Sequence, residues 1–323
     1  MRINPYKIGK SSRFGISPRI KQRFNKLPTL KGPEGKWWRR GLIAVGVILL
    51  ALIVYHFLKP ETSLMSSVEV KRVENRGMLT VGVRYDMPGF SEDGEGLEVE
   101  LAMLLARKLL PDSDDPLKLV ECTSKTVSTK LKDGTIDVAI ALQTKSSSYA
   151  CSYPYFTDKV YLVTLNALNK AKTPPEMRIG YIPETAAGSV FSAYVLRVTS
   201  AAERTLVDKI LGRPTPTPDP ATAVTIDAVK LGSYDELISA LKSGEIDAAV
   251  MAGAYVTKYF DVSPELSGVG EYYLCDTVIG SLEYCIVASK DDPAFASIAD
   301  MLIYRLNEDG TLKELKQKYG LFR

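Results

Sequence analysis

Histidine and cysteine are scarce in this chain of 323 residues, which contains one histidine, His56, and four cysteines. No two of the cysteines are spaced as CxxC. Histidine and cysteine at short spacings make most zinc sites and many other transition-metal sites in proteins. We therefore predict no metal site and no bound cofactor.

Acidic residues are almost missing from the first forty positions, where twelve lysines and arginines accompany a single acid, Glu34. The chain after Leu58 is instead net acidic. A strongly basic tail can bind anionic lipid or nucleic acid. No zinc-finger or helix-turn-helix pattern accompanies this tail. We therefore interpret residues 1–40 as a basic cytoplasmic tail beside the membrane and predict no nucleic-acid partner.

Charged residues are missing altogether between Gly41 and Leu58, an apolar run interrupted only by His56. A helix of this length reaches about 27 Å, close to the thickness of a hydrocarbon core. The basic residues before the run place the N-terminus in the cytoplasm. We predict a transmembrane helix at 41–58, with everything after it extracellular or periplasmic. A cleaved secretory signal is the alternative, but the charged leader is long and no small-x-small cleavage site follows.

All four cysteines fall on the predicted outer side, where disulfides can persist. Four thiols allow three pairings. The shortest-range choice joins Cys122 to Cys151 and Cys275 to Cys285. Free buried thiols are the alternative.

The outer part alternates apolar strands with amphipathic helices. This pattern is typical of an α/β fold in which helices cover a parallel sheet. The predicted strands are 79–83, 117–122 and 136–142, and the predicted helices are 97–110 and 126–132.

Residues 131–140 recur in similar form as residues 241–250. In both copies a glycine follows a helical pattern and a buried strand begins at once, which predicts a left-handed glycine that ends the helix. The repeat suggests two lobes of similar design, although helix–glycine–strand is common in any α/β protein. Residues 214–220, rich in proline, predict a stiff surface excursion.

Several short motifs in this order resemble the family 3 extracellular solute-binding proteins, the amino-acid receptors of ABC importers with the type II periplasmic-binding fold. The resemblance covers about Lys71 to Gly320. The motifs are Val81–Asp86 with Gly96–Leu101, Thr123-Ser124 followed by Leu131 and Asp137, Ser152–Tyr155, Ser233–Leu237, and Leu306–Leu312.

The resemblance implies two lobes joined by a hinge, closing on a small-molecule solute that is passed to an ABC permease. It implies a linker at 59–70, a first lobe made of 71–160 and 278–323, and a second lobe at 161–277. The ligand is expected in the cleft between them, beyond the carboxyl ends of the strands. The residues expected to meet it are Tyr85, Phe90, Thr123, Ser124, Gln143, Thr144, Lys145, Glu184, Thr185 and Ala252. Tyr85 and Phe90 could equally be loop aromatics that cover the edge of the sheet.

The chain departs from the family where the charges of an α-amino acid are usually held. An arginine that clamps the α-carboxylate is usual shortly after the position of Thr144, but residues 145–149 contain none. Lys145 is the one cation there. Ala252 stands near the usual place of an aspartate that pairs with the ammonium group, so an ordinary α-amino acid would lack both partners.

Three functions compete. The first is a membrane-tethered extracytoplasmic protein that binds a small polar solute, amino-acid-like or an organic acid, for an ABC importer or for sensing. The second is a degenerate scaffold or interaction protein at the membrane surface. The third is a dehydratase-like enzyme on the same fold. Because the outer part has no histidine to act as acid or base, we predict that the chain is not an enzyme.

Overall fold

The computed structural model describes residues 45–48, 64–199, 225–261 and 272–321. The chain divides into two compact units, Met1–Pro60 and Glu61–Arg323. In the first unit only residues 45–48 are described; they are helical, and their side chains are exposed. None of the helices in the described ranges has the length and apolar character needed to span a bilayer. The predicted tail, most of the predicted span and the proline-rich excursion at 214–220 lie outside the described residues.

Within the described residues, nine strands form one hydrogen-bonded sheet, in the order β2-β1-β3-β9-β4-β7-β5-β6, with β8 paired to β4. The strands are β1 (Leu79–Val83), β2 (Leu117–Glu121), β3 (Val138–Ala139), β4 (Ala150–Thr164), β5 (Arg178–Tyr181), β6 (Asp227–Lys230), β7 (Ala248–Ala252), β8 (Tyr273–Leu274) and β9 (Gly280–Ala288).

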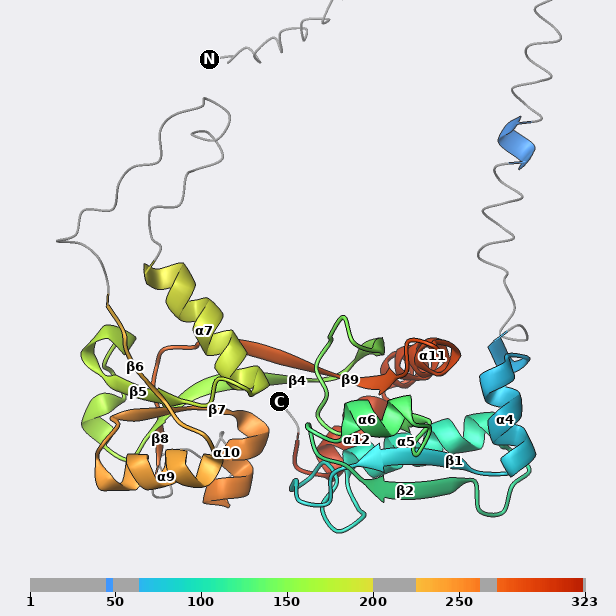
Figure 1. The fold of residues 1–323 in the computed structure, drawn as a ribbon, viewed down its shortest axis with the longest axis horizontal. Coiled ribbons are helices and arrows are strands. Elements are labelled where there is room, and N and C mark those ends of the chain that lie inside the picture. Colours follow the sequence, from blue (N-terminus) through green and yellow to red (C-terminus); the bar gives the residue numbers. More distant parts are fainter. Residues whose placement is uncertain (1–44, 49–63, 200–224, 262–271, 322–323) are drawn as a thin grey trace, which may run out of the picture. The chain divides into compact units, whose positions relative to one another are not determined.

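Two long antiparallel strands, β4 and β9, carry the sheet from one lobe to the other (Figure 1). The end of β9 at Ala288 pairs with β3, whereas β4 around Val160 pairs with β7. The sheet is therefore continuous in its hydrogen bonds but narrows to a two-stranded bridge between lobes. This arrangement confirms the predicted two-lobed α/β architecture.

The lobes repeat one design, as the sequence echo suggested. In the first lobe β1 pairs in parallel with β2 and β3, and in the second lobe β5 pairs in parallel with β6 and β7. The two glycines of the echo, Gly134 and Gly244, have φ angles of 75° and 76°, which confirms the predicted left-handed conformation. The predicted strand 136–142 is shorter than expected: only Val138–Ala139 joins the ladder as a strand.

Helices pack on the sheet in both lobes (Figure 1). Local signals explain their limits: Ser67 and Ser233 cap α4 and α9 by accepting hydrogen bonds from main-chain N–H groups, and Gly77 and Gly244 end these helices. The helices of the first lobe are α4 (Val68–Arg76), α5 (Leu97–Leu109), α6 (Val127–Lys132), α11 (Ala294–Glu308) and α12 (Thr311–Lys318); those of the second are α7 (Ala186–Thr199), α9 (Tyr234–Ser243) and α10 (Gly253–Phe260).

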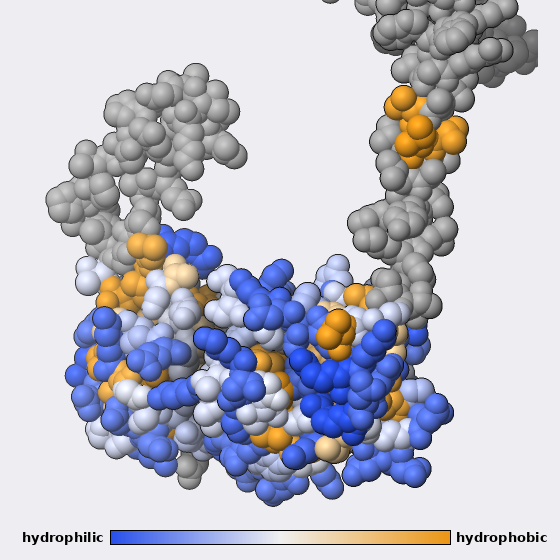
Figure 2. Space-filling model, turned by 45° about the vertical axis from the view of Figure 1, so that its right-hand side comes forward, coloured by the Kyte–Doolittle hydropathy of each residue, from blue (hydrophilic) through white to orange (hydrophobic). Residues whose placement is uncertain are grey.

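Apolar side chains fill the space between helices and sheet. Leu97, Leu101, Leu105 and Leu109, four residues apart on α5, are all buried, as expected for a helix with one apolar face. On the face of the second unit seen in Figure 2, most of the coloured surface is polar, with smaller apolar areas between. The core therefore holds the strand ends, and the loops that leave them, in fixed positions.

Candidate functional site: a cleft between the lobes

A cavity of about 660 Å³ lies between the two lobes, where loops leave the carboxyl ends of the parallel strands. This is the edge at which open α/β sheets generally bind ligands. The first lobe contributes residues that follow β1, β2 and β3, and the second contributes residues that follow β5, β6 and β7. Tyr284 and Leu282 of the bridging strand β9 also line it.

Seven of the ten predicted ligand-binding residues line this cavity. Six of them follow the ends of strands, and Ala252 is the last residue of β7. They are Thr123, Ser124, Gln143, Thr144, Glu184, Thr185 and Ala252.

The other three predicted residues, Tyr85, Phe90 and Lys145, do not line the cleft. Phe90 is buried and packs edge-to-face on Phe156, with ring centroids 5.0 Å apart. Tyr85 is half-buried and packs against the core. The positions of Tyr85 and Phe90 after β1 do not reveal on which side of the loop their rings lie.

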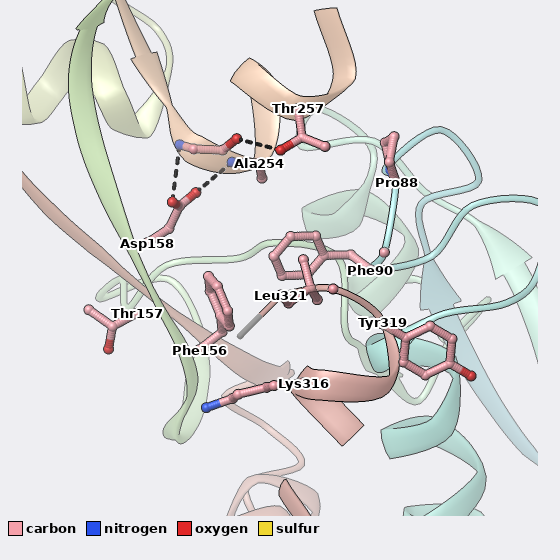
Figure 3. A pocket seen from close by; sticks show the side chains of 13 residues that line it. Pro88, Phe90, Phe156, Thr157, Asp158, Ala254, Thr257, Lys316, Tyr319 and Leu321 are labelled. Carbon is pink, nitrogen blue, oxygen red and sulfur yellow. Dashed lines mark hydrogen bonds between the residues drawn. The ribbon is translucent and has the colours of Figure 1, made fainter. Parts of the chain in front are cut away.

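Phe90 instead belongs to a second cavity of about 330 Å³ beside the bridge (Figure 3). Its ring also lies edge-to-face on Tyr284, at 6.2 Å, and Tyr284 lines the interlobe cleft. In the same region the buried carboxylate of Asp158 on β4 accepts hydrogen bonds from the N–H groups of Gly253 and Ala254, both at 3.0 Å. Asp158 thus occupies the N-terminus of α10 and fixes this helix of the second lobe to the bridge.

Arg84, which sequence reasoning missed, is the most buried cation in the cleft, with 8% of its surface exposed. It directly follows β1. Its Nε and Nη2 donate to the two carboxylate oxygens of Asp86, each at 2.8 Å, and its Nη1 donates to the Tyr255 hydroxyl at 2.6 Å. A guanidinium has five N–H groups. These three bonds leave one N–H on Nη1 and one on Nη2.

The charge on Arg84 is firmly held. Burial alone would lower its pKa, but the hydrogen bonds and charges of Asp86 and Tyr255 outweigh burial and raise the pKa above its ordinary value. The same contact holds the pKa of Asp86 below its usual range. Arg84 therefore presents a permanent positive charge to the cavity.

Asp86 also connects the lobes, because its Oδ2 accepts a hydrogen bond from Nζ of Lys258 on α10. Arg84 and Asp86 belong to the first lobe, whereas Tyr255 and Lys258 belong to the second. The four side chains form a polar bridge across one side of the cleft. Opening the lobes here would break the ion pair of Lys258 with Asp86 and the hydrogen bond from Arg84 to Tyr255.

Aromatic rings form one wall of the cleft in the second lobe. The ring of Tyr255 is stacked on that of Tyr234, with centroids 4.3 Å apart and planes inclined by 11°. Burial raises the pKa of both phenols, so both are neutral hydroxyls at physiological pH. Stacked neutral phenols offer an apolar face with polar edges.

Glu98, on α5, supports the floor of the cleft although it is completely buried. Its Oε1 accepts from the N–H of Leu142 at 2.8 Å and from the hydroxyl of Tyr155 at 2.5 Å, and its Oε2 accepts from Ser91 at 2.8 Å. Leu142 lines the cleft and has a φ of 52°, an unfavourable angle for a branched side chain. Glu98 therefore stabilises a strained backbone position directly before Gln143 and Thr144.

Two other sequence expectations concern metals and disulfides. Among the described residues no group of three or more histidine, cysteine, aspartate or glutamate side chains could hold a metal ion. All four cysteines are free thiols, so neither of the two shortest-range pairs is formed.

Comparison with known proteins identifies the family of the chain. Residues 79–322 match the family described as bacterial extracellular solute-binding proteins, family 3. The chain belongs to this family. Sequence comparison also finds a glutamine-binding protein from Geobacillus stearothermophilus, 26% identical over 69% of this chain and 76% of that protein.

Solved structures of similar fold are more distant in sequence. An amino acid ABC transporter substrate-binding protein from Streptococcus pneumoniae, bound to L-arginine, is 17% identical, with a TM-score of 0.53 over 78% of this chain and 98% of that one. The ancestral amino-acid-binding protein AncCDT-1, described as a precursor of cyclohexadienyl dehydratase, is 19% identical, with a TM-score of 0.52 over 77% and 98%. These likenesses show the shared two-lobed fold.

Proposed function

We propose that this family 3 member is a membrane-tethered extracytoplasmic receptor for a small solute that carries a carboxylate, either an amino-acid-like compound or an organic acid. The receptor would deliver the solute to an ABC importer or report its presence. The observation that carries the proposal is the buried guanidinium of Arg84 in the interlobe cleft, with two N–H groups left over from its protein bonds.

Arg84 offers an answer to the missing arginine after Thr144. A planar guanidinium can bind a carboxylate through two parallel hydrogen bonds, which the ammonium of a lysine cannot do. Arg84 reaches the cavity from the first lobe, as the predicted residues at 123–124 and 143–144 do. A carboxylate at Arg84 would lie beside the hydroxyl of Tyr255 in the second lobe. This hydroxyl accepts from Arg84 and could donate its own proton to the ligand, which would favour closure of the two lobes.

Glu184 is the one carboxyl side chain among the described residues that line the cleft. It lies after β5, in the second lobe. It is our candidate for pairing with a ligand ammonium group, since Ala252 cannot do so. Thr123, Ser124, Gln143, Thr144 and Thr185 are proposed to complete the polar contacts, with hydrogen bonds of about 1 kcal/mol each.

The absence of a histidine, and the presence of one carboxyl group, in the described lining favour binding over acid–base chemistry. The dehydratase-like alternative would need a placed proton donor, for which Glu184 is the candidate. We propose a binding role. If no solute binds in the experiments below, the result would favour the scaffold role.

Recovery of the natural solute tests this proposal. The full chain, purified without added ligand, is denatured, and the released small molecules are identified by mass spectrometry. A small carboxylate should be recovered from the wild type and from Arg72→Met, but not from Arg84→Met. Arg72 is the matched control because its ion pair with Asp292 lies on the surface of the first lobe. Equal recovery from Arg84→Met would overturn the role of Arg84.

The membrane tether is tested separately. The full chain is proposed to resist extraction from membranes by alkaline carbonate, whereas a chain beginning at Ser66 should be released. Protease added outside the cell should degrade the part after Lys59 and spare the tail at 1–40. Release of the full chain by carbonate would contradict the tether and leave the cleft proposal untouched.

A further inference from the structure

The strand order brings only one pair of cysteines, Cys151 and Cys285, to nearby positions on neighbouring strands. Strands in a sheet lie about 4.8 Å apart, and a disulfide needs Cα atoms within about 7 Å. Cys122 directly follows β2, which is three strands away from β9 and four from β4 in the sheet order. This places Cys122 roughly 14 Å from the strand of Cys285 and roughly 19 Å from that of Cys151.

Cys275 is excluded by its position along the bridge. Its N–H donates to the carbonyl of Leu162, eleven residues along β4 from Cys151. At about 3.3 Å per residue the separation is roughly 36 Å. Cys285 pairs opposite Pro154, which leaves it roughly 26 Å from Cys275 by the same measure.

Cys151 and Cys285, in contrast, are neighbours on the two paired strands of the bridge. Cys151 lies opposite Val287 on β9, two residues from Cys285, and the register shift between Cys151 and Pro154 lies between them. Cys151 packs against the apolar cluster that contains both Cys285 and Val287. The thiol of Cys285 donates to the carbonyl of Gln143 at 3.5 Å. Burial first, and then the neighbouring Cys151, raise the pKa of Cys285 to about 12.

We propose that Cys151 and Cys285 form a disulfide when the protein meets a disulfide oxidant such as oxidised glutathione. The thiolate of the half-exposed Cys151 attacks the oxidant, giving a mixed disulfide and one reduced glutathione. The sulfur of Cys285, after losing its proton, displaces the second glutathione. Two S–H groups are lost, one S–S bond forms, and one oxidised glutathione becomes two reduced molecules.

The bond would lie at the first-lobe end of the two bridging strands. The covalent loop from Cys151 to Cys285 would include the whole second lobe together with both bridging strands. Closing so long a loop restricts the unfolded chain and so stabilises the folded protein. The N–H of Cys285 still donates to the carbonyl of Gln143 at 2.8 Å, so this edge of the cleft would keep its main-chain bond.

Peptide mapping tests the inference. The full chain is equilibrated with oxidised and reduced glutathione, alkylated, digested without reduction and analysed by mass spectrometry. We expect a linked peptide with Cys151 and Cys285. The intact oxidised protein, measured before alkylation, should be about 2 Da lighter than the reduced form. The link should persist in Cys275→Ser and Cys122→Ser and disappear in Cys151→Ser. Oxidation should also raise the melting temperature by several degrees, reversibly with dithiothreitol.

Two results would overturn the inference. One is a link from Cys151 to Cys122 or to Cys275. The other is a stable mixed disulfide of Cys151 with glutathione, while Cys285 remains a free thiol that is alkylated once the protein is unfolded. Cys151→Ser is the informative variant because its side chain is half-exposed and its replacement leaves the buried Cys285 in place.

Discussion

Arg84, at the end of β1, donates a hydrogen bond of 2.6 Å to the hydroxyl of Tyr255 on α10, so a cation of the first lobe meets a phenol of the second across the cleft. The ring of Tyr255 is in turn held by stacking on Tyr234. The proposed recognition of a ligand and the contact between the lobes therefore share the side chain of Arg84. A ligand that binds Arg84 acts at the point where the lobes already touch.

Removing the Tyr255 hydroxyl should weaken the contact between lobes and leave the stacked rings in place. In Tyr255→Phe a buried hydrogen bond to a charged group is lost, and we expect the free energy of unfolding to fall by about 1.5–3 kcal/mol. Urea denaturation measures this change. Tyr259→Phe, on the same helix and in the same stack, is the matched control and should change stability by less. Equal losses in the two variants would argue against the contact.

The fully buried Glu98 should make stability depend on pH. Burial, opposed only in part by hydrogen bonds from Tyr155, Leu142 and Ser91, raises its pKa from 4.5 to about 7. Between these values the folded protein holds a proton that the unfolded chain releases, so stability falls as pH rises from about 4.5 to about 7. The full loss is roughly 3 kcal/mol.

Glu98→Gln should abolish this part of the pH dependence, as measured by urea denaturation at pH 5 and pH 8. Glu100→Gln is a control of opposite sign. The pKa of Glu100 is lowered, mainly by its hydrogen bond from Lys318, so its contribution is present at neutral pH and is lost as the pH falls towards that lowered value. If the free energy of unfolding falls between pH 5 and pH 8 by the same amount in the wild type and in Glu98→Gln, another group controls the pH dependence.

Asp158 should be the main polar fixture of the bridge. Its carboxylate accepts the N–H groups of Gly253 and Ala254 and the hydroxyl of Tyr284, all at 3.0 Å. Asp158→Ala leaves these buried donors without their acceptor, and we expect a loss of about 3–5 kcal/mol in the free energy of unfolding. Tyr284→Phe, which loses one buried hydrogen bond to a charged group, should cost about 1.5–3 kcal/mol. Asp114→Asn, in an exposed loop, should be neutral; a similar loss there would contradict the assignment.

The sequence predicted the parts of this molecule that depend on local pattern. Two lobes of one design were predicted from a repeated pattern, in which a helix ends at a glycine and a buried strand follows. The pattern occurs at 131–140 and again at 241–250. Parallel strands end at the same edge of a sheet. Residues that follow such strands, Thr144 after β3 and Thr185 after β5, could therefore be placed in the cleft.

The parts that the sequence did not predict depend on side-chain direction and on distant partners. The ring of Phe90 packs on Phe156 and Tyr284, which are far from it in the chain, and therefore does not line the cleft. Arg84 followed a recognisable strand, but its burial depends on Tyr255, 171 residues away. The proposed pairing of Cys151 with Cys285 depends on the order of strands in the sheet, which spacing along the chain does not reveal.

Thermal denaturation of the purified full chain with a panel of amino acids, small peptides and organic acids tests the central claim most directly. A solute that binds the closed cleft at a hundred times its dissociation constant should stabilise the fold by about 2.7 kcal/mol, or roughly 5–10 °C in melting temperature. The account predicts such a rise with at least one carboxylate-bearing solute, and its loss in Arg84→Met but not in Arg72→Met. No shift with any member of the panel, or a shift retained in Arg84→Met, would contradict it.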